Sequence, residues 1–175
     1  MRNKVKPIAD LKKTLADRRV KGQKIVFTNG CFDLIHIGHT RYLQAARELG
    51  DLLVVGVNSD ASVRGLNKGA GRPIVPEAQR AEVLAALACV DYVVLFDEPD
   101  PGRLIADLQP DILVKGGDWA PDQIIGREIV EARGGIVRTI PLVPGVSTTS
   151  VMQKIQATKA GGSPAGAPPA PTGKS

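Results

Sequence analysis

The segment Leu52–Val57, LLVVGV, constrains the fold more than any other part of the chain. A strand with almost no polar position is buried on both faces, as in parallel sheets that helices cover on either side. Similar short apolar or β-branched segments occur at Lys24–Phe27, Tyr92–Phe96, Ile112–Lys115 and Ile136–Leu142. Segments with helical character separate them. We therefore predict one α/β domain with a doubly wound parallel sheet of about five strands.

Helices are expected at Pro7–Arg19, 39–49, Pro76–Leu87, Pro101–Leu108, Pro121–Arg133 and Ser147–Ala157. Glycines follow two of them, at Gly50 and Gly134, which is a common way for a helix to end. In such Rossmann-like sheets, ligands bind beyond the carboxyl ends of the strands. Functional residues are therefore expected just after each strand.

The charge of the chain is unevenly distributed. Its 175 residues carry a formal net charge of +5. Residues 1–24 hold nine basic and two acidic side chains and are expected to form a basic helical segment. Residues 25–156, the expected enzymatic domain, hold twelve basic and sixteen acidic side chains, so the high pI does not indicate a nucleic-acid partner. Residues 157–175 are rich in Ala, Gly and Pro and are expected to be a disordered tail.

The sequence also bears on where the protein works. No apolar run approaches the roughly 18 residues that a membrane span needs, and the first ten residues lack a signal-peptide core. Two cysteines, Cys31 and Cys89, are too few for a disulfide framework and are interpreted as buried apolar fillers. We expect a soluble cytoplasmic protein without membrane insertion.

The segment after the first strand, TNGCFDLIHIGHTRYL at residues 28–43, is the most informative for function. It contains both histidines of the chain, His36 and His39, which share one side if a helix begins near His36. Gly30 and Gly38 leave backbone room for a ligand. Free N–H groups and two imidazoles at a helix start form a phosphate site. Half of a metal site is the alternative, but further Cys or His ligands are absent except for the two cysteines, and no metal site is expected.

This segment resembles the signature G-x-F-D-x-x-H-x-G-H of the nucleotidyltransferase superfamily of cytidylyl- and adenylyltransferases. The matching residues are Gly30, Phe32, Asp33, His36, Gly38 and His39. A second, hydroxyl-rich motif of that family is similar to Gly145–Ser150, although its basic position falls at Met152. The resemblance extends over about residues 25–156. It is strongest to the branch that makes ADP-heptose, through TNGCFDLIHIGH, GVNSDASV, GRPIVPEAQR, LVKGGDW and GVSTTS.

The resemblance implies a reaction. It is the transfer of an adenylyl group from ATP, with Mg²⁺, to D-glycero-β-D-manno-heptose 1-phosphate, giving ADP-heptose and pyrophosphate for lipopolysaccharide core synthesis. Family members occur fused to a sugar kinase, for which 175 residues leave no room, so a stand-alone enzyme is expected. The resemblance also implies a homodimer, because related enzymes often associate as dimers.

The expected site residues fall into three groups. The catalytic group is His36, His39 and Lys115. The nucleotide-binding group is Thr28, Asn29, Gly30, Phe32, Asp33, Gly38, Gly116, Gly117, Asp118, Ser147, Thr148 and Thr149. The substrate-binding group is Asn58, Asp60, Lys68, Arg72 and Arg80. Arg80 is included because a cation in the first turns of a helix opposes the helix dipole and needs an anion.

Several of these assignments have structural alternatives. The hydroxyls at 147–149 are also typical of an ordinary helix N-cap. The segment 115–118 is also compatible with a β-turn, and Asp60 is also compatible with a helix cap. Lys68 and Arg72 also suit solvated loop charges, and Trp119 is placed either near the base or in a structural role. Asp33 either organises its loop or helps to place the metal.

Two other functions compete with adenylyl transfer. A cytidylyltransferase that uses CTP and a small phosphorylated alcohol, such as glycerol 3-phosphate, carries the same histidine motif. A nucleotide-binding sensor without turnover is the alternative from another class. The complete pair of His36 and His39 argues against it, whereas the missing basic residue at Met152 leaves it open.

Overall fold

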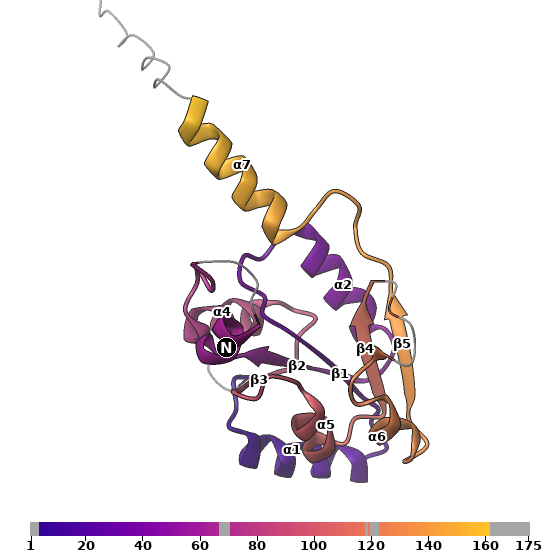
Figure 1. Ribbon diagram of the computed structural model, residues 1–175. Coiled ribbons are helices and arrows are strands. Elements are labelled where there is room, and N and C mark those ends of the chain that lie inside the picture. The colour runs from indigo at the N-terminus through magenta and orange to yellow at the C-terminus, as the bar shows by residue number, and fades with distance from the viewer. Residues whose placement is uncertain (1–3, 67–70, 118, 120–122, 162–175) are drawn as a thin grey trace, which may run out of the picture.

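The computed structural model describes residues 4–66, 71–117, 119 and 123–161 (Figure 1). The helices are α1 Ile8–Val20, α2 Ile37–Arg47, α3 Asp60–Gly65, α4 Glu77–Ala86, α5 Gly102–Leu108, α6 Arg127–Glu131 and α7 Thr148–Gly161. The strands are β1 Ile25–Gly30, β2 Leu52–Asn58, β3 Tyr92–Phe96, β4 Ile112–Gly116 and β5 Ile136–Ile140. The predicted residues Lys68 and Asp118 lie outside the described part of the chain.

The five strands form one parallel sheet in the order β3-β2-β1-β4-β5. The chain runs outward from β1 to β3 and then returns to place β4 on the other side of β1. The strand order therefore reverses between β1 and β4, which is where ligands bind in such sheets. The predicted Rossmann-like α/β fold is confirmed.

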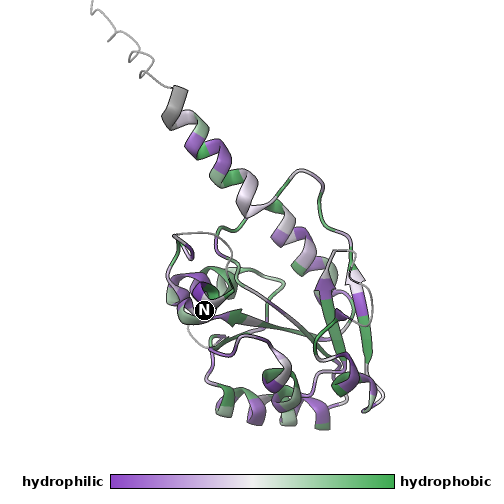
Figure 2. Ribbon diagram, in the orientation of Figure 1, coloured by the Kyte–Doolittle hydropathy of each residue, from purple (hydrophilic) through white to green (hydrophobic). Residues whose placement is uncertain are grey.

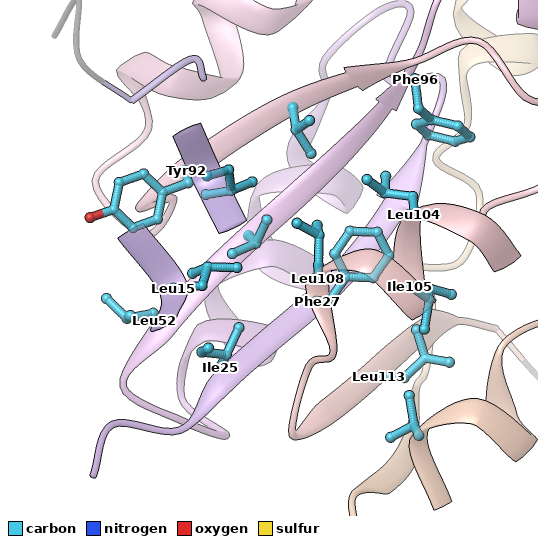
Figure 3. Close-up of a cluster of buried hydrophobic side chains, with 14 of the residues drawn as sticks. Leu15, Ile25, Phe27, Leu52, Tyr92, Phe96, Leu104, Ile105, Leu108 and Leu113 are labelled. Carbon is cyan, nitrogen blue, oxygen red and sulfur yellow. The ribbon is translucent and has the colours of Figure 1, made fainter. Parts of the chain in front are cut away.

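The core is divided by the sheet into two apolar layers. Alternate residues of each strand enter opposite layers, so that Phe27 and Val54 pack against α1, α5 and α6, as Figure 3 shows in part. Val26 and Val55 pack on the other face against α2 and α4. Burial on both faces explains why LLVVGV lacks the polar alternation of a half-exposed strand (Figure 2).

The N-terminal segment is part of this core. Leu11 and Leu15 on α1 are fully buried beneath the sheet, and Val5 forms a bridge with Val93 at the β3 edge. Several basic side chains hold this segment in place. Lys4 donates hydrogen bonds to the carbonyl oxygens of Leu87 and Val90, just beyond α4.

Arg19 binds the end of helix α5, where it donates hydrogen bonds to the carbonyl oxygens of Leu108 and Gln109. Cations near the C-terminus of a helix are favourable because carbonyl groups there have no partner within the helix. Part of the basic charge at the start of the chain therefore serves packing.

The elements differ from the prediction mainly in length. The short helix α3 was anticipated only through the alternative role of Asp60 as a helix cap. Its N-cap is the preceding residue, Ser59, whose hydroxyl accepts from the N–H of Ser62. The helix predicted at Pro121–Arg133 begins only at Arg127 in the described residues. Helix α7 continues to Gly161, through positions assigned to the tail, and extends away from the sheet (Figure 1). In the described part of the chain, no helix is long and apolar enough to cross a membrane.

Candidate functional site

A cavity of about 300 Å³ opens at the carboxyl edge of the sheet, between the ends of β1 and β4. The loop after β1, the start of α2, the segment before α4, the end of β4 and the start of α7 contribute to its wall. Its lining residues are Asn29, Gly30, Cys31, Phe32, Asp33, His36, Gly38, His39, Tyr42, Arg72, Gly116, Leu142, Val143, Val146, Ser147 and Thr148.

The cavity exists because β1 and β4 separate at their carboxyl ends. β1 pairs with β2 as far as Gly30, whereas its pairing with β4 ends at Phe27 and Leu113. Beyond that point, side chains join the two strands. The ammonium group of Lys115 donates a hydrogen bond to the side-chain oxygen of Asn29. Lys115 therefore supports a lining residue and is not itself part of the cavity wall.

His36 and His39 lie at the start of α2. His36 is the N-cap residue in an extended conformation, and its side chain makes no capping hydrogen bond. The two rings stack with centroids 3.8 Å apart and planes 19° apart. No acidic residue lies in the first turn of α2, so nothing on the helix competes with an anion there.

Burial sets the protonation of this pair. It lowers the pKa of His39 to about 4, with His36 as a further cause, and it also lowers the pKa of His36. Both rings are therefore neutral at pH 7. Their Nδ1 atoms are buried, and neither has a hydrogen-bond partner among the described residues. Buried polar atoms without a partner are rare in folded proteins, and two of them occur together here at the cavity.

Gly38 is required by the packing of this pair. A Cβ atom at position 38 would lie 3.0 Å from the His36 ring and 3.7 Å from the carbonyl oxygen of Val146. The glycine thus lets the His36 ring rest against the first turn of α2, close to the segment that leads into α7. The preceding turn is also tight, since Phe32 has a positive φ of 48°.

Asp33 is 3% exposed and organises its surroundings. Its carboxylate accepts hydrogen bonds from the backbone N–H groups of Ile74 and Val75 at 2.8 and 2.9 Å, and from Nε of Arg72 at 3.0 Å. These bonds hold the pKa of Asp33 below its usual value despite the opposing effect of burial. Of its two predicted roles, the structure favours the organisation of the loop.

Arg72 is positioned by that carboxylate at the cavity wall. Its Nε contacts Asp33, and the guanidinium group carries further N–H donors in a fixed fork. Its side chain is only 11% exposed, so it is not a solvated loop charge.

The start of α7 lines the same cavity as the histidines. Ser147 and Ser150 cap the helix reciprocally, since each hydroxyl accepts from the other residue's backbone N–H at 3.0 Å. Thr148 lines the cavity and is buried, whereas Thr149 is exposed and does not line it. The N-cap and the cavity wall are therefore formed by the same short segment.

Arg80 is placed differently from the prediction. It is 1% exposed, and its guanidinium group donates to the carbonyl oxygens of Cys31, Asn58 and Val75 and to the carboxylate of Asp60. The anion that it needs is a protein side chain. Arg80 therefore joins the loops around the cavity and does not line the cavity itself.

Other predicted residues also lie outside the cavity wall. Asn58 is 4% exposed and donates to the hydroxyl of Ser62. Thr28 is fully buried beneath the cavity floor. Gly117 has a positive φ of 102° and follows the lining residue Gly116. Trp119 is half exposed and donates from its indole N–H to the carbonyl oxygen of Gly116.

The sequence reasoning missed five lining residues: Cys31, Tyr42, Leu142, Val143 and Val146. Cys31 was expected only as a filler; it is buried, whereas Cys89 is half-buried. Tyr42 was detectable, because it lies three residues after His39 on the same helix and therefore on the same face. Leu142 and Val143 follow β5 in a segment without a pattern, whereas Val146 lies inside the motif Gly145–Ser150, of which only the hydroxyl residues were assigned to the site.

The cavity does not present a ligand set for a resident metal ion. The oxygens of Asp33 are occupied by three donors, and no group of three or more His, Cys, Asp or Glu side chains is gathered anywhere in the described ranges. A metal ion at this site would therefore depend on oxygens supplied by a ligand.

Comparisons with known proteins agree with this geometry. A family model described as cytidylyltransferase-like matches residues 27–159. The bifunctional protein HldE of Geotalea uraniireducens is 56% identical over 87% of the chain, and that of Hahella chejuensis is 53% identical over 85%. The chain spans only 31% of the length of these relatives.

Solved structures are similar as well. A lipopolysaccharide core biosynthesis protein from Thermoplasma volcanium matches with a TM-score of 0.58 and 29% identity, over 70% of this chain and 98% of its own. Pantothenate synthetase from Thermus thermophilus matches with a TM-score of 0.61 over 90% of this chain and 70% of its own. Its 17% identity supports the fold alone.

Proposed function

Because the chain belongs to the cytidylyltransferase-like family, we propose that it transfers the adenylyl group of ATP to D-glycero-β-D-manno-heptose 1-phosphate. The products are ADP-heptose and pyrophosphate. The observation that carries this proposal is the stacked pair of His36 and His39 at the start of α2, which lines one cavity together with the start of α7. The identity to the HldE proteins, and the similarity to a lipopolysaccharide core biosynthesis protein of Thermoplasma volcanium, support a role in lipopolysaccharide core synthesis. We place this activity in the cytoplasm.

The reaction requires little acid–base chemistry. An oxygen of the sugar 1-phosphate attacks the α-phosphorus of ATP, and the bond from that phosphorus to the bridging oxygen breaks. Pyrophosphate leaves on the side opposite the attacking oxygen and takes the electron pair of that bond. Because the second pKa of a phosphate monoester is about 6, the attacking oxygen is already ionised at neutral pH. The barrier is therefore mainly one of alignment and of charge on the phosphate oxygens.

The lining residues suit that task. The neutral imidazoles of His36 and His39 each offer one N–H to a phosphate oxygen, beside the free N–H groups at the start of α2. Arg72 supplies a positive charge that Asp33 holds in place. Thr148, with the first N–H groups of α7 beside it, meets the outer phosphates in the same cavity. Donors fixed in advance around developing charge account for much of the rate enhancement of such enzymes.

Mg²⁺ enters as part of the substrate, bound to the phosphates of ATP. It neutralises charge on the leaving pyrophosphate. No step is assigned to a protein-bound metal, because the oxygens of Asp33 already accept from Arg72, Ile74 and Val75.

The choice of nucleotide and acceptor is tested by a matrix experiment. Purified protein is incubated with ATP or CTP and with heptose 1-phosphate or glycerol 3-phosphate, and the products are identified by phosphorus NMR. ADP-heptose and pyrophosphate are expected only from ATP with heptose 1-phosphate. A product that contains CMP would contradict the adenylyl assignment, and tight ATP binding without turnover would favour the sensor.

A further inference from the structure

We propose that Tyr42 is a positioning residue of this site. Its phenol bridges the separating ends of β1 and β4 and thereby fixes helix α2, which carries the histidine pair. The expected effect on turnover rests on the proposed function, whereas the effect on the histidines does not.

The bridge lies where the sheet opens. The pairing of β1 with β4 stops at Phe27 and Leu113, and the next residue of each strand contacts Tyr42 instead. The Tyr42 hydroxyl lies 2.6 Å from Oγ1 of Thr28 and 3.2 Å from the carbonyl oxygen of Val114. A side chain from α2 thus replaces the backbone pairing at the base of the cavity.

The direction of both hydrogen bonds follows from the number of protons. A carbonyl oxygen only accepts, so the single phenol proton of Tyr42 is donated to Val114, and the hydroxyl of Thr28 donates to the phenol oxygen. Burial raises the pKa of Tyr42 to about 12, so the proton is retained throughout the neutral range. The Thr28 hydroxyl, the Tyr42 hydroxyl and the Val114 carbonyl therefore form a chain of two hydrogen bonds with a single donor–acceptor order.

The same side chain shapes the cavity wall. A Cβ atom at Gly116 would lie 3.3 Å from the Tyr42 ring, so the ring packs directly against the backbone at the end of β4. Tyr42 is 8% exposed and lies one helical turn after His39. Movement of its ring would therefore displace the histidines relative to both strands.

The chain contains a matched control. It has two tyrosines, and the other, Tyr92, also uses its hydroxyl in a partly buried hydrogen bond, which it accepts from Arg18 near the start of β3. Tyr42→Phe and Tyr92→Phe each remove one such hydroxyl and keep the ring. Only Tyr42→Phe acts at the cavity. Thermal unfolding of both variants reports any general loss of stability.

The first readout is the imidazole NMR spectrum. The chain has two histidines, so their resonances and titration curves are resolved without assignment of the whole spectrum. Tyr42→Phe is expected to shift them, and Tyr92→Phe to leave them unchanged. Unchanged histidine signals in Tyr42→Phe would overturn the proposal, whether or not the wild-type protein transfers adenylyl groups.

The second readout is turnover. Tyr42→Phe is expected to lower kcat about tenfold with a change in the KM for ATP of less than about threefold, because misalignment affects the transition state more than ground-state binding. Thr28→Val removes the other hydroxyl of this chain of hydrogen bonds. The fold loss of kcat in the double variant should therefore be smaller than the product of the losses in the two single variants. Wild-type kcat in Tyr42→Phe, or a double variant whose loss equals that product, would contradict the proposal. An inactive wild-type protein would refute the proposed function alone.

Discussion

The rings of His36 and His39 stack with their centroids 3.8 Å apart, so the protonation of one ring disfavours the protonation of the other. Because desolvation also lowers the pKa of both rings, the contact at neutral pH is one between neutral rings. It also places two N–H donors side by side at one wall of the cavity. The consequences extend to stability, turnover and the packing of α2.

The first prediction concerns stability against pH. The pKa of His39 falls from 6.5 in the unfolded chain to about 4 in the folded protein, so the unfolded state binds more protons between these values. The contribution of His39 to stability is complete above pH 6.5 and is lost as the pH falls towards 4. The melting temperature should therefore decrease from pH 7 to pH 5.

Two glutamine variants isolate this effect. His39→Gln cannot titrate and should flatten the pH dependence of the melting temperature over that range. His36→Gln should flatten it less, since burial lowers the pKa of His36 less far. Equal slopes in His39→Gln and the wild-type protein would show that His39 is not buried in its neutral form.

Turnover provides the second prediction. His39→Ala removes one fixed donor from the cavity wall and should lower kcat about 100-fold, which is typical for the loss of a transition-state donor. The circular dichroism spectrum should stay unchanged, because the side chain lies at the start of α2 and not in either apolar layer. Wild-type turnover in this variant would refute the assigned mechanism.

Two adjacent threonines give the third prediction. Thr148 lines the cavity and Thr149 is exposed beside it, although the sequence places both in the same hydroxyl-rich motif. Thr148→Ala should raise the KM for ATP several-fold through the loss of one hydrogen bond, worth about 1 kcal/mol. Thr149→Ala should leave KM unchanged. Steady-state kinetics at several ATP concentrations separates the two, and equal effects would exclude this selective role of Thr148.

Two arginines give the fourth prediction. Arg72→Met should mainly weaken turnover and substrate binding, because its guanidinium lies at the cavity wall. Arg80→Met leaves the carboxylate of Asp60 and several carbonyl groups without their partner, and should lower the free energy of unfolding by about 3–5 kcal/mol. Urea unfolding and kinetics on both variants test the contrast. The reverse pattern would restore Arg80 as a substrate ligand.

Arg80 also shows why a local sequence pattern cannot identify the partner of a charged side chain. Its position in the first turns of a helix correctly indicated that an anion lies nearby, but a local pattern does not say whose anion it is. Its partners Cys31 and Asn58 are 49 and 22 residues away. Only the packing of β1 against β2 brings them together. Thr28 was likewise assigned to nucleotide binding, whereas its hydroxyl contacts Tyr42 on α2, a partner that the local sequence does not indicate.

Features set by short-range patterns were predictable. The apolar segment Leu52–Val57 defined a buried parallel strand, and the spacing of His36 and His39 placed both at one helix start. The basic segment before β1 was only half understood. Its charge was counted, but Lys4 and Arg19 cap the ends of helices that follow much later in the chain. Apolar lining residues such as Leu142 carry no periodic signal.

The last prediction concerns the glycine beneath His36. Gly38 and Gly65 both lie in helices, where alanine is favoured over glycine by about 1 kcal/mol. A Cβ atom at Gly65 meets nothing within 4 Å, so Gly65→Ala should raise the melting temperature and leave turnover unchanged. Gly38→Ala places the same atom 3.0 Å from the His36 ring, which must then move. We expect a loss of turnover of about tenfold with little loss of stability, measured by kcat and melting temperature on the same samples. Wild-type kcat in Gly38→Ala would mean that the stacked position of His36 is not needed for the reaction.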